Sequence, residues 1–155
     1  MRNDIERTLH RLVGQPLWAV GRAASLTWFQ FGDRRLVSTR QGDTKEVGSY
    51  ALHLQCPWSW SRSWGEVIAD NFSSHEELSG LLIAPVTCDG IEARDDGAFQ
   101  MTFADHTVLV VVPTRVMQPD EYDEYWRFFV PYAATPHFVV GPRGVDNAVY
   151  EQPGT

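Results

Sequence analysis

Apolar and polar residues alternate most clearly between Pro85 and Pro113, and the pattern predicts a three-stranded antiparallel meander. From Phe99 to Phe103 every second residue is large and apolar, which is the period of a strand with one buried face. Asp95–Gly97 before this strand and Asp105–His106 after it have the composition of turns. We expect this meander to form the centre of the fold.

The match of apolar residues across the strands predicts the two loop lengths. A three-residue first loop, with Gly97 in the left-handed conformation, sets Phe99 opposite Ala93 and Met101 opposite Ile91. A two-residue second turn at Asp105–His106 would pair Phe103 with Val108, Met101 with Val110 and Phe99 with Val112. Residues 108–112 are then apolar on both faces, which predicts an interior strand that is covered on both sides.

Two segments have helical patterns. Apolar residues recur at helical spacing along residues 3–13, where Asn3 and Glu6 resemble a capping box. Ser74 followed by Glu77 fits the same capping pattern and predicts a short helix to about Ile83. Both helices would lie on the sheet.

The remaining pattern predicts further strands and loops. Strands are expected at 17–31 with an interruption around Gly21, and at 36–39, 50–56, 66–70, 125–130 and 137–140. Residues 40–48 and 58–64 are expected to be loops, and the tail from about residue 141 to be loosely held. We therefore predict a single α+β domain over residues 1–155, with a largely antiparallel sheet of roughly six to eight strands and two short helices packed on it. A lipocalin-like closed barrel is the alternative.

Composition narrows the classes of partner. The chain has 155 residues, with 20 acidic residues against 13 basic ones, and a net charge of −7. This balance disfavours nucleic-acid binding through a basic surface and suits either solubility or a basic protein partner. No apolar run approaches the roughly 20 residues of a membrane span, and the N-terminus lacks the apolar core of a signal peptide, so we expect a cytoplasmic protein.

Sequence motifs for catalysis, metals and cofactors are missing. No H-E-x-x-H, C-x-x-C, G-x-G-x-x-G or G-x-S-x-G spacing occurs, so we expect no cofactor and no metal. His53 and Cys56 lie three apart on a predicted strand, where their side chains point to opposite faces. Cys56 and Cys88 are expected to be reduced and buried. The sequence therefore assigns no catalytic residue and favours a protein that is not an enzyme.

An acidic segment with interleaved aromatic residues is the leading candidate for a binding site. Carboxylates beside tyrosine and tryptophan suit a basic partner, because charges steer it and aromatic side chains anchor it. The residues are Asp120, Glu121, Tyr122, Asp123, Glu124, Tyr125 and Trp126. The leading hypothesis is a non-enzymatic protein-binding module, such as an immunity-type protein that masks a basic toxin or nuclease.

The alternative is a small-molecule binding protein, or a weak hydrolase, with a pocket near His53. Three indoles at Trp58, Trp60 and Trp64, with Arg62 among them, could form a stacking surface for a ligand ring. The competing interpretation is structural: the same indoles would close the open end of the sheet, since tryptophan is highly buried on average. The two interpretations differ in whether the indoles are exposed.

Four segments together resemble a family of small, uncharacterised bacterial proteins. They are GRAASLTWFQFG (21–32), YALHLQCPW (50–58), YWRFF (125–129) and HFVV (137–140), and they span most of the chain. The resemblance implies a bacterial cytoplasmic protein and brings no activity or catalytic residue with it.

Overall fold

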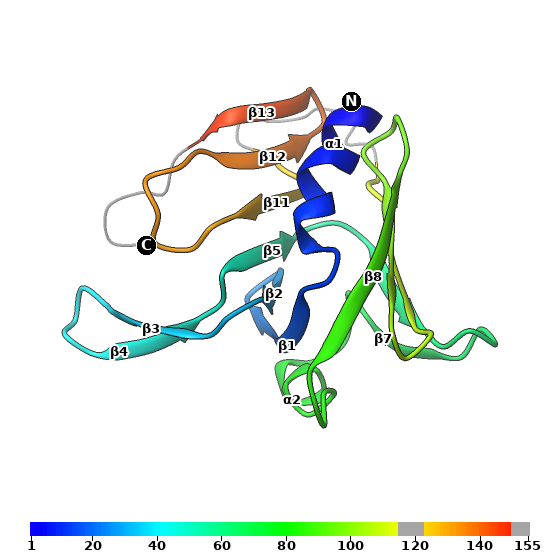
Figure 1. Cartoon of the computed structure of the whole chain (residues 1–155). Coiled ribbons are helices and arrows are strands. Elements are labelled where there is room, and N and C mark those ends of the chain that lie inside the picture. The colour runs from blue at the N-terminus through cyan, green and yellow to red at the C-terminus, as the bar shows by residue number, and fades with distance from the viewer. Residues whose placement is uncertain (115–122, 150–155) are drawn as a thin grey trace.

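The computed structural model describes residues 1–114 and 123–149, and most of this part of the chain is antiparallel sheet (Figure 1). An 11-stranded sheet runs in the order β13-β12-β11-β5-β2-β1-β8-β9-β10-β6-β7, and β3 (Arg35–Ser38) pairs with β4 (Thr44–Val47) in a separate two-stranded ribbon. The large sheet bends sharply between β1 and β8. We call the strands on one side of this bend the first half and those on the other the second half.

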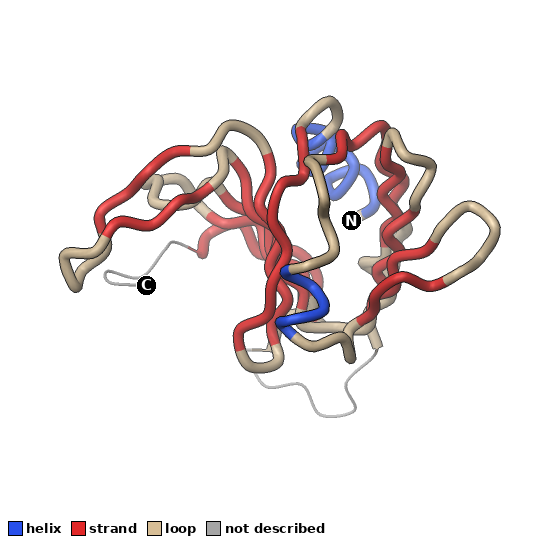
Figure 2. Tube along the Cα trace, turned by 90° about the horizontal axis from the view of Figure 1, so that it is seen from below, coloured by secondary structure: helices blue, strands red, loops and turns tan. Residues whose placement is uncertain are grey.

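The first half consists of β1 (Pro16–Ala23), β2 (Leu26–Phe31), β5 (Tyr50–Leu54), β11 (Trp126–Phe129), β12 (His137–Gly141) and β13 (Gly144–Val149). The second half consists of β6 (Trp58–Ser61), β7 (Val67–Asp70), β8 (Val86–Ala93), β9 (Phe99–Phe103) and β10 (Val108–Val111). Only the pairs Pro16↔Thr87 and Leu17↔Val86 join β1 to β8. Figure 2 shows the strands gathered in two groups on either side of the bend.

The core lies between the two halves, whose inner faces meet. Phe29 of β2 packs edge-on against Trp58 of β6 with ring centroids 5.6 Å apart, and Phe99 of β9 packs against Trp126 of β11 at 4.9 Å. The indole nitrogens are satisfied across the same gap, since Trp58 Nε1 donates to Thr27 Oγ1 at 3.2 Å. Side chains, more than backbone pairing, therefore hold the halves together.

The expectation of an α+β fold with a sheet of roughly six to eight strands is wrong, because the helices are too short to form a layer and the large sheet has 11 strands. Helix α1 (Arg2–Leu9) and the 3-10 turn η1 (His10–Leu12) bury Ile5, Leu9 and Leu12 where the two halves of the sheet converge (Figure 1). Helix α2 (His75–Ser79) has 5 residues. The sheet covers itself by bending, so the described residues form a predominantly antiparallel β fold. In this part of the chain β13 and β7 remain unpaired edges, and the sheet does not close into a barrel.

Each of the two helices agrees with its prediction only in part. Ser74 and Glu77 form the predicted capping box, but α2 ends at Ser79, with Gly80 as its C-cap, and does not reach the predicted Ile83. Asn3 does not cap α1, whose N-cap is Met1 without a side-chain hydrogen bond. Glu6 instead accepts a hydrogen bond from the backbone N–H of Ala93, which ties α1 to the end of β8.

The first predicted register of the meander is confirmed and the second is wrong. Met101 lies opposite Ile91 and Phe99 opposite Ala93, and Gly97 has a φ of 88° in the connecting loop, as the left-handed position requires. On the other side Leu109 pairs with Met101 and Val111 with Phe99. The second turn has three residues, 104–106, with His106 in the left-handed conformation at φ 68°. Leu109 and Val111 are consequently fully buried, while Val112 is 50% exposed and the outer face of this strand is only partly covered.

Three further segments differ from their predicted state. Residues 44–47 of the expected polar loop form β4, and Trp58–Ser61 of the expected aromatic loop form β6. The tail that was expected to be loose contains β13, which pairs with β12. The break between β1 and β2 falls at Ala24 and Ser25, with Ala24 at φ 55°, and Gly21 lies inside β1 opposite Trp28.

None of the helices in the described part of the chain has the length and apolar character needed to cross a bilayer.

Candidate functional site

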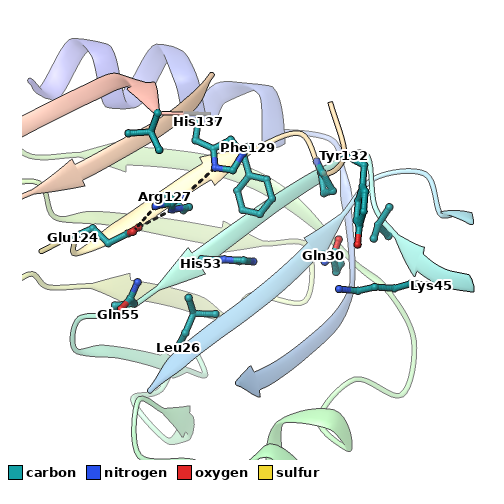
Figure 3. Close-up of a pocket in the computed structure, with 13 residues that line it drawn as sticks. Leu26, Gln30, Lys45, His53, Gln55, Glu124, Arg127, Phe129, Tyr132 and His137 are labelled. Atoms are coloured by element: carbon teal, nitrogen blue, oxygen red, sulfur yellow. Dashed lines mark hydrogen bonds and ion pairs between the residues drawn. The ribbon is translucent and has the colours of Figure 1, made fainter. Parts of the chain in front are cut away.

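A pocket of about 410 Å³ opens on the outer face of the first half, away from the core (Figure 3). We call it the outer pocket. Its polar lining residues are Gln30, Lys45, His53, Gln55, Glu124, Arg127 and His137, and its apolar ones are Leu26, Val47, Phe129, Pro131, Tyr132 and Val149. Strand alternation produces this mixture, because every second residue of β2, β5 and β11 points away from the core. The volume lies in the range typical of small-molecule sites.

Adjacent strands bring the charged and titratable groups together. Arg127 of β11 lies opposite His53 of β5 in the ladder, and β12 supplies His137 on the other side of β11. Arg127 Nε donates to Glu124 Oε2 at 2.8 Å, and its Nη2 donates to the other carboxylate oxygen. These side chains are only 23% and 12% exposed. A bidentate pair with so little solvent holds the guanidinium in one orientation.

The third contact of Arg127 fixes the tautomer of His137. Arg127 Nη1 lies 2.9 Å from His137 Nδ1, and because a guanidinium only donates, Nδ1 must be the acceptor. The proton of the neutral imidazole is therefore on Nε2, which is buried and has no hydrogen-bond partner among the described residues. His137 is 3% exposed, and burial together with Arg127 lowers its pKa. A buried donor without a partner is uncommon. The described residues therefore leave the hydrogen bonding in this part of the pocket incomplete.

His53 is also a neutral histidine. Its ring stands edge-on to Phe129 at a centroid distance of 4.7 Å, and Phe129 in turn stacks on His137 at 4.2 Å. Burial lowers the pKa of His53 to about 4, and the electrostatic effects of Arg127, His137 and Lys45 lower it further. At neutral pH the imidazole can donate from one nitrogen and accept at the other.

The β3–β4 ribbon forms the remaining wall. Arg35 of β3 donates to the carbonyl of Pro131, and Gln30 Oε1 accepts a hydrogen bond from the backbone N–H of Gly48 at 2.8 Å, just after β4. These contacts place Lys45 and Val47 at the pocket. Lys45 is exposed, and no carboxylate of residues 1–114 and 123–149 forms an ion pair with it.

A second hollow of about 550 Å³ lies beside the β12–β13 turn and shares Glu124 and Arg127 with the outer pocket. Its other charged residues are Asp123, Arg143 and Asp146. It lacks both histidines and the aromatic wall of Phe129 and Tyr132. We therefore regard the outer pocket as the candidate site.

The structure separates His53 from the tryptophans that were expected to share its pocket. Trp58 and Trp60 point into the core and are 3% and 1% exposed. Trp64 is 73% exposed in the β6–β7 hairpin, where Arg62 lies over its ring at 5.7 Å and Glu66 accepts from its Nε1. Neither Arg62 nor any of the three indoles lines the outer pocket.

The predicted acidic–aromatic segment is also divided. Asp120, Glu121 and Tyr122 lie outside the described residues. Tyr125 and Trp126 are 9% and 0% exposed, and Trp126 Nε1 donates to the Gly97 carbonyl inside the core. Glu124 is paired with Arg127, and Asp123 lies beside it at the edge of the second hollow. Tyr125 and Trp126 therefore stabilise the fold and are not available as exposed anchors.

The thiols and possible metal ligands offer no chemistry in the described residues. Cys56 and Cys88 are free and buried, as expected, and burial raises their pKa values to about 12 and about 11. Such thiols are almost entirely protonated at neutral pH and unreactive. No group of three or more metal-ligating side chains occurs in this part of the chain.

Sequence reasoning found His53 but missed Arg127, His137, Lys45 and Gln30. One feature of the sequence could have identified Arg127, since it interrupts the apolar run from Tyr125 to Val130. A charged residue within a strand of this kind must face solvent, a partner or a pocket. The pairing of β5 with β11 cannot be derived from the local pattern.

No protein-family model, no curated protein and no solved structure matches this chain. The resemblance to uncharacterised bacterial proteins consequently stays a prediction.

Proposed function

We propose that the protein binds a small molecule in the outer pocket. The observation that supports this most strongly is the group of incompletely bonded polar side chains in a cavity of about 410 Å³. His137 has a buried donor without a partner among the described residues, and His53 has no hydrogen bond to any of them. A buried donor left unsatisfied, as in His137, costs about 1–3 kcal/mol, and a ligand that bonds to it recovers that cost.

The arrangement favours binding over catalysis. The cysteine thiols are protonated and lie away from His53, and the carboxylate in the pocket, Glu124, is already engaged by Arg127. A nucleophile activated by an adjacent base is therefore missing from the described lining residues. The hydrolase alternative has no support from this geometry.

Ligand-dependent thermal unfolding tests the proposal. A library of soluble fragments is screened against the wild type, His53→Ala and the control His10→Ala, which removes an exposed histidine on η1. A ligand at about 100 times its Kd adds about 2.7 kcal/mol, which raises Tm by roughly 5–10 °C for a domain of this size. We expect hits that stabilise the wild type and His10→Ala but not His53→Ala. A library that stabilises none of the three, or all three equally, contradicts the proposal.

The protein-binding module stays the second candidate, and the acidic surplus of 20 acids against 13 bases favours it. Its anchors would have to be exposed residues other than Tyr125 and Trp126. Affinity capture from a bacterial lysate at low and high salt tests it. Retention of a basic protein that weakens with salt, in both the wild type and His53→Ala, supports the module, and recovery of no salt-sensitive partner contradicts it.

A further inference from the structure

We propose that the outer pocket selects small organic anions, with the charged group held between Lys45, His53 and Gln30 and an apolar body against Phe129 and Tyr132. This inference rests on the proposed function and specifies the chemical class of its ligand. The expected ligand is a carboxylic acid with a ring or a short aliphatic chain.

The charge of the pocket is opposite to that of the whole chain. Among the described lining residues, two cationic side chains, Lys45 and Arg127, stand against one carboxylate, Glu124. Arg127 and Glu124 neutralise each other in their bidentate pair, and the histidines are neutral, so the charge of Lys45 is left over. A positive site in a chain of net charge −7 attracts an anion locally and is not explained by the overall composition.

The side chains that would bind the anion point toward one another. Figure 3 shows Lys45 reaching in from the β3–β4 ribbon and His53 from β5, with Gln30 between them. Gln30 already accepts from Gly48 with Oε1, so the end of its amide that can serve a ligand is the Nε2 donor. An ammonium, an imidazole N–H and an amide N–H are three donors for one carboxylate.

The apolar wall argues against an inorganic anion. Phe129 is fixed between His53 and His137 by ring contacts, and Tyr132 and Pro131 continue the wall. Phosphate or sulfate would leave this apolar surface exposed to water. A ring or an aliphatic chain would bury it, which contributes about 25 cal/mol of binding free energy per Å² of apolar surface. The pocket therefore suits a molecule with one charged end and one apolar end.

Lys45 is the one lysine of the 155-residue sequence, which gives a direct reporter. Reductive methylation with ¹³C-formaldehyde labels Lys45 and the N-terminus, and dimethylation keeps the positive charge. The protein is titrated with acetate, benzoate, 2-naphthoate and octanoate, with the neutral amide of each acid, and with inorganic phosphate. We expect the Lys45 resonance to shift with the larger carboxylates, and these to bind at least tenfold more tightly than their amides.

A second reporter is the imidazole of His53, followed by NMR in the unmodified protein. The groups that face it are Arg127, His137 and Lys45, all of which disfavour the imidazolium. A carboxylate beside the ring adds negative charge, so the apparent pKa of His53 should rise in the complex. A neutral amide should leave it unchanged.

Charge reversal at one site, with a matched control, separates selection from general electrostatics. Lys45→Glu should weaken carboxylate binding at least tenfold and leave amide binding within about twofold. Arg40→Glu makes the same charge change in the same ribbon, at an exposed residue that does not line the pocket, and should leave both unchanged.

The outcomes distinguish this inference from the proposed function. Equal binding of acids and amides, with no effect of Lys45→Glu, overturns the anion class and leaves the pocket as a binding site. Phosphate binding as tightly as 2-naphthoate overturns the apolar part of the inference. If no acid or amide binds, the inference is wrong, and the fragment screen then decides separately whether the outer pocket binds any small molecule.

Discussion

The two faces of strands β5 and β11 differ sharply, although they come from alternate residues of the same segments. Leu52 and Trp126 point inward and are fully buried in the core. His53 and Arg127, the next residues along each strand, point outward into the pocket. The inner face has satisfied its indole nitrogens, whereas the outer face keeps a buried histidine nitrogen without a partner among the described residues.

This difference shows which face of the sheet contributes to stability and which is suited to binding. The inner residues contribute apolar burial, which is the main favourable term in folding. The outer residues are buried enough to be desolvated but are not fully hydrogen-bonded, which costs stability. Substitutions on the two faces should therefore have different consequences, and four predictions test that difference from the largest effect to the smallest.

Trp126→Ala should have the largest effect, because it removes a fully buried indole between the two halves of the sheet. We expect a loss of about 3–5 kcal/mol in the free energy of unfolding, measured by urea denaturation. Trp64→Ala is the control, since this indole is 73% exposed, and it should change stability by no more than about 0.5 kcal/mol. Similar losses for both variants would contradict the placement of Trp126 in the core.

Glu124→Ala should have the next largest effect, because it leaves Arg127 desolvated without its carboxylate. Breaking a buried pair from one side costs about 3 kcal/mol. The control is Glu46→Ala, which breaks a 3.8 Å pair with Arg34 whose side chains are both 48% exposed, and it should cost less than about 1 kcal/mol. Equal, small effects in urea denaturation would mean that the outer face is solvated like an ordinary surface.

The outer face should also make stability depend on pH. His53 has a pKa of about 4 in the folded protein against 6.5 in the unfolded chain. Above about pH 6.5 its contribution is constant, and as the pH falls from 6.5 to about 4 the unfolded chain takes up a proton that the folded protein does not. This should cost about 2–3 kcal/mol, and the lowered pKa of His137 acts in the same direction.

Urea denaturation at pH 7 and pH 5 measures part of this loss, about 2 kcal/mol. In His53→Ala the difference between the two pH values should be smaller than in the wild type, whereas His10→Ala should keep the full difference. A wild-type protein that is equally stable at both pH values would show that His53 is readily protonated in the folded state.

Gly21→Ala should have the smallest effect of the four. Gly21 lies opposite Trp28 on the outer face, and a Cβ atom would come within 2.1 Å of the indole ring. The ring must move, at a cost of about 1–3 kcal/mol in the free energy of unfolding. Gly80→Ala is the control, since its Cβ would meet nothing closer than 3.5 Å at the end of α2. Equal stability of the two variants in urea denaturation would mean that Trp28 does not cover Gly21.

The part of the fold that could be predicted from sequence is the part in which polar and apolar residues alternate. Phe99 and Met101 could face only Ala93 and Ile91 if apolar residues were to match, and the structure has this register. Where Val108–Val112 is apolar throughout, no face is distinguished and the pattern cannot fix the register. The three-residue turn decides it, with Asp105 Oδ1 accepting from both the backbone N–H and the hydroxyl of Thr107.

The fold class was mispredicted for a related reason. A stripe of apolar residues over 3–13 gives a helix but not its length, and the helical residues end at Leu12 in a 3-10 turn. Strands β4 and β13 are largely polar and exposed, so they lack the alternation that identifies a strand. Their hydrogen-bonded partners make them strands.

Of the histidine and arginine side chains of the candidate site, only His53 was identified from the sequence. His53 could be singled out as a histidine on a strand, but Arg127 and His137 join it through pairing between β5, β11 and β12. The predicted tryptophans failed to join it because alternation places Trp58 and Trp60 on the inner side of β6. Long-range strand order decides which predicted side chains meet, and the local pattern of polar and apolar residues does not reveal that order.

The narrow seam between β1 and β8, with the pairs Pro16↔Thr87 and Leu17↔Val86, has a consequence for how the molecule comes apart. A broad ladder lets one strand detach while its neighbours persist. Here the described backbone joins the two halves through this short ladder and through the hydrogen bonds of Cys88 with Gly14 and Gln15. The two halves are held together mainly by the packing of aromatic rings between them. Amide protons in the cores of both halves should therefore exchange with solvent through one shared opening reaction. The free energy of opening measured by hydrogen exchange should be the same for the two halves.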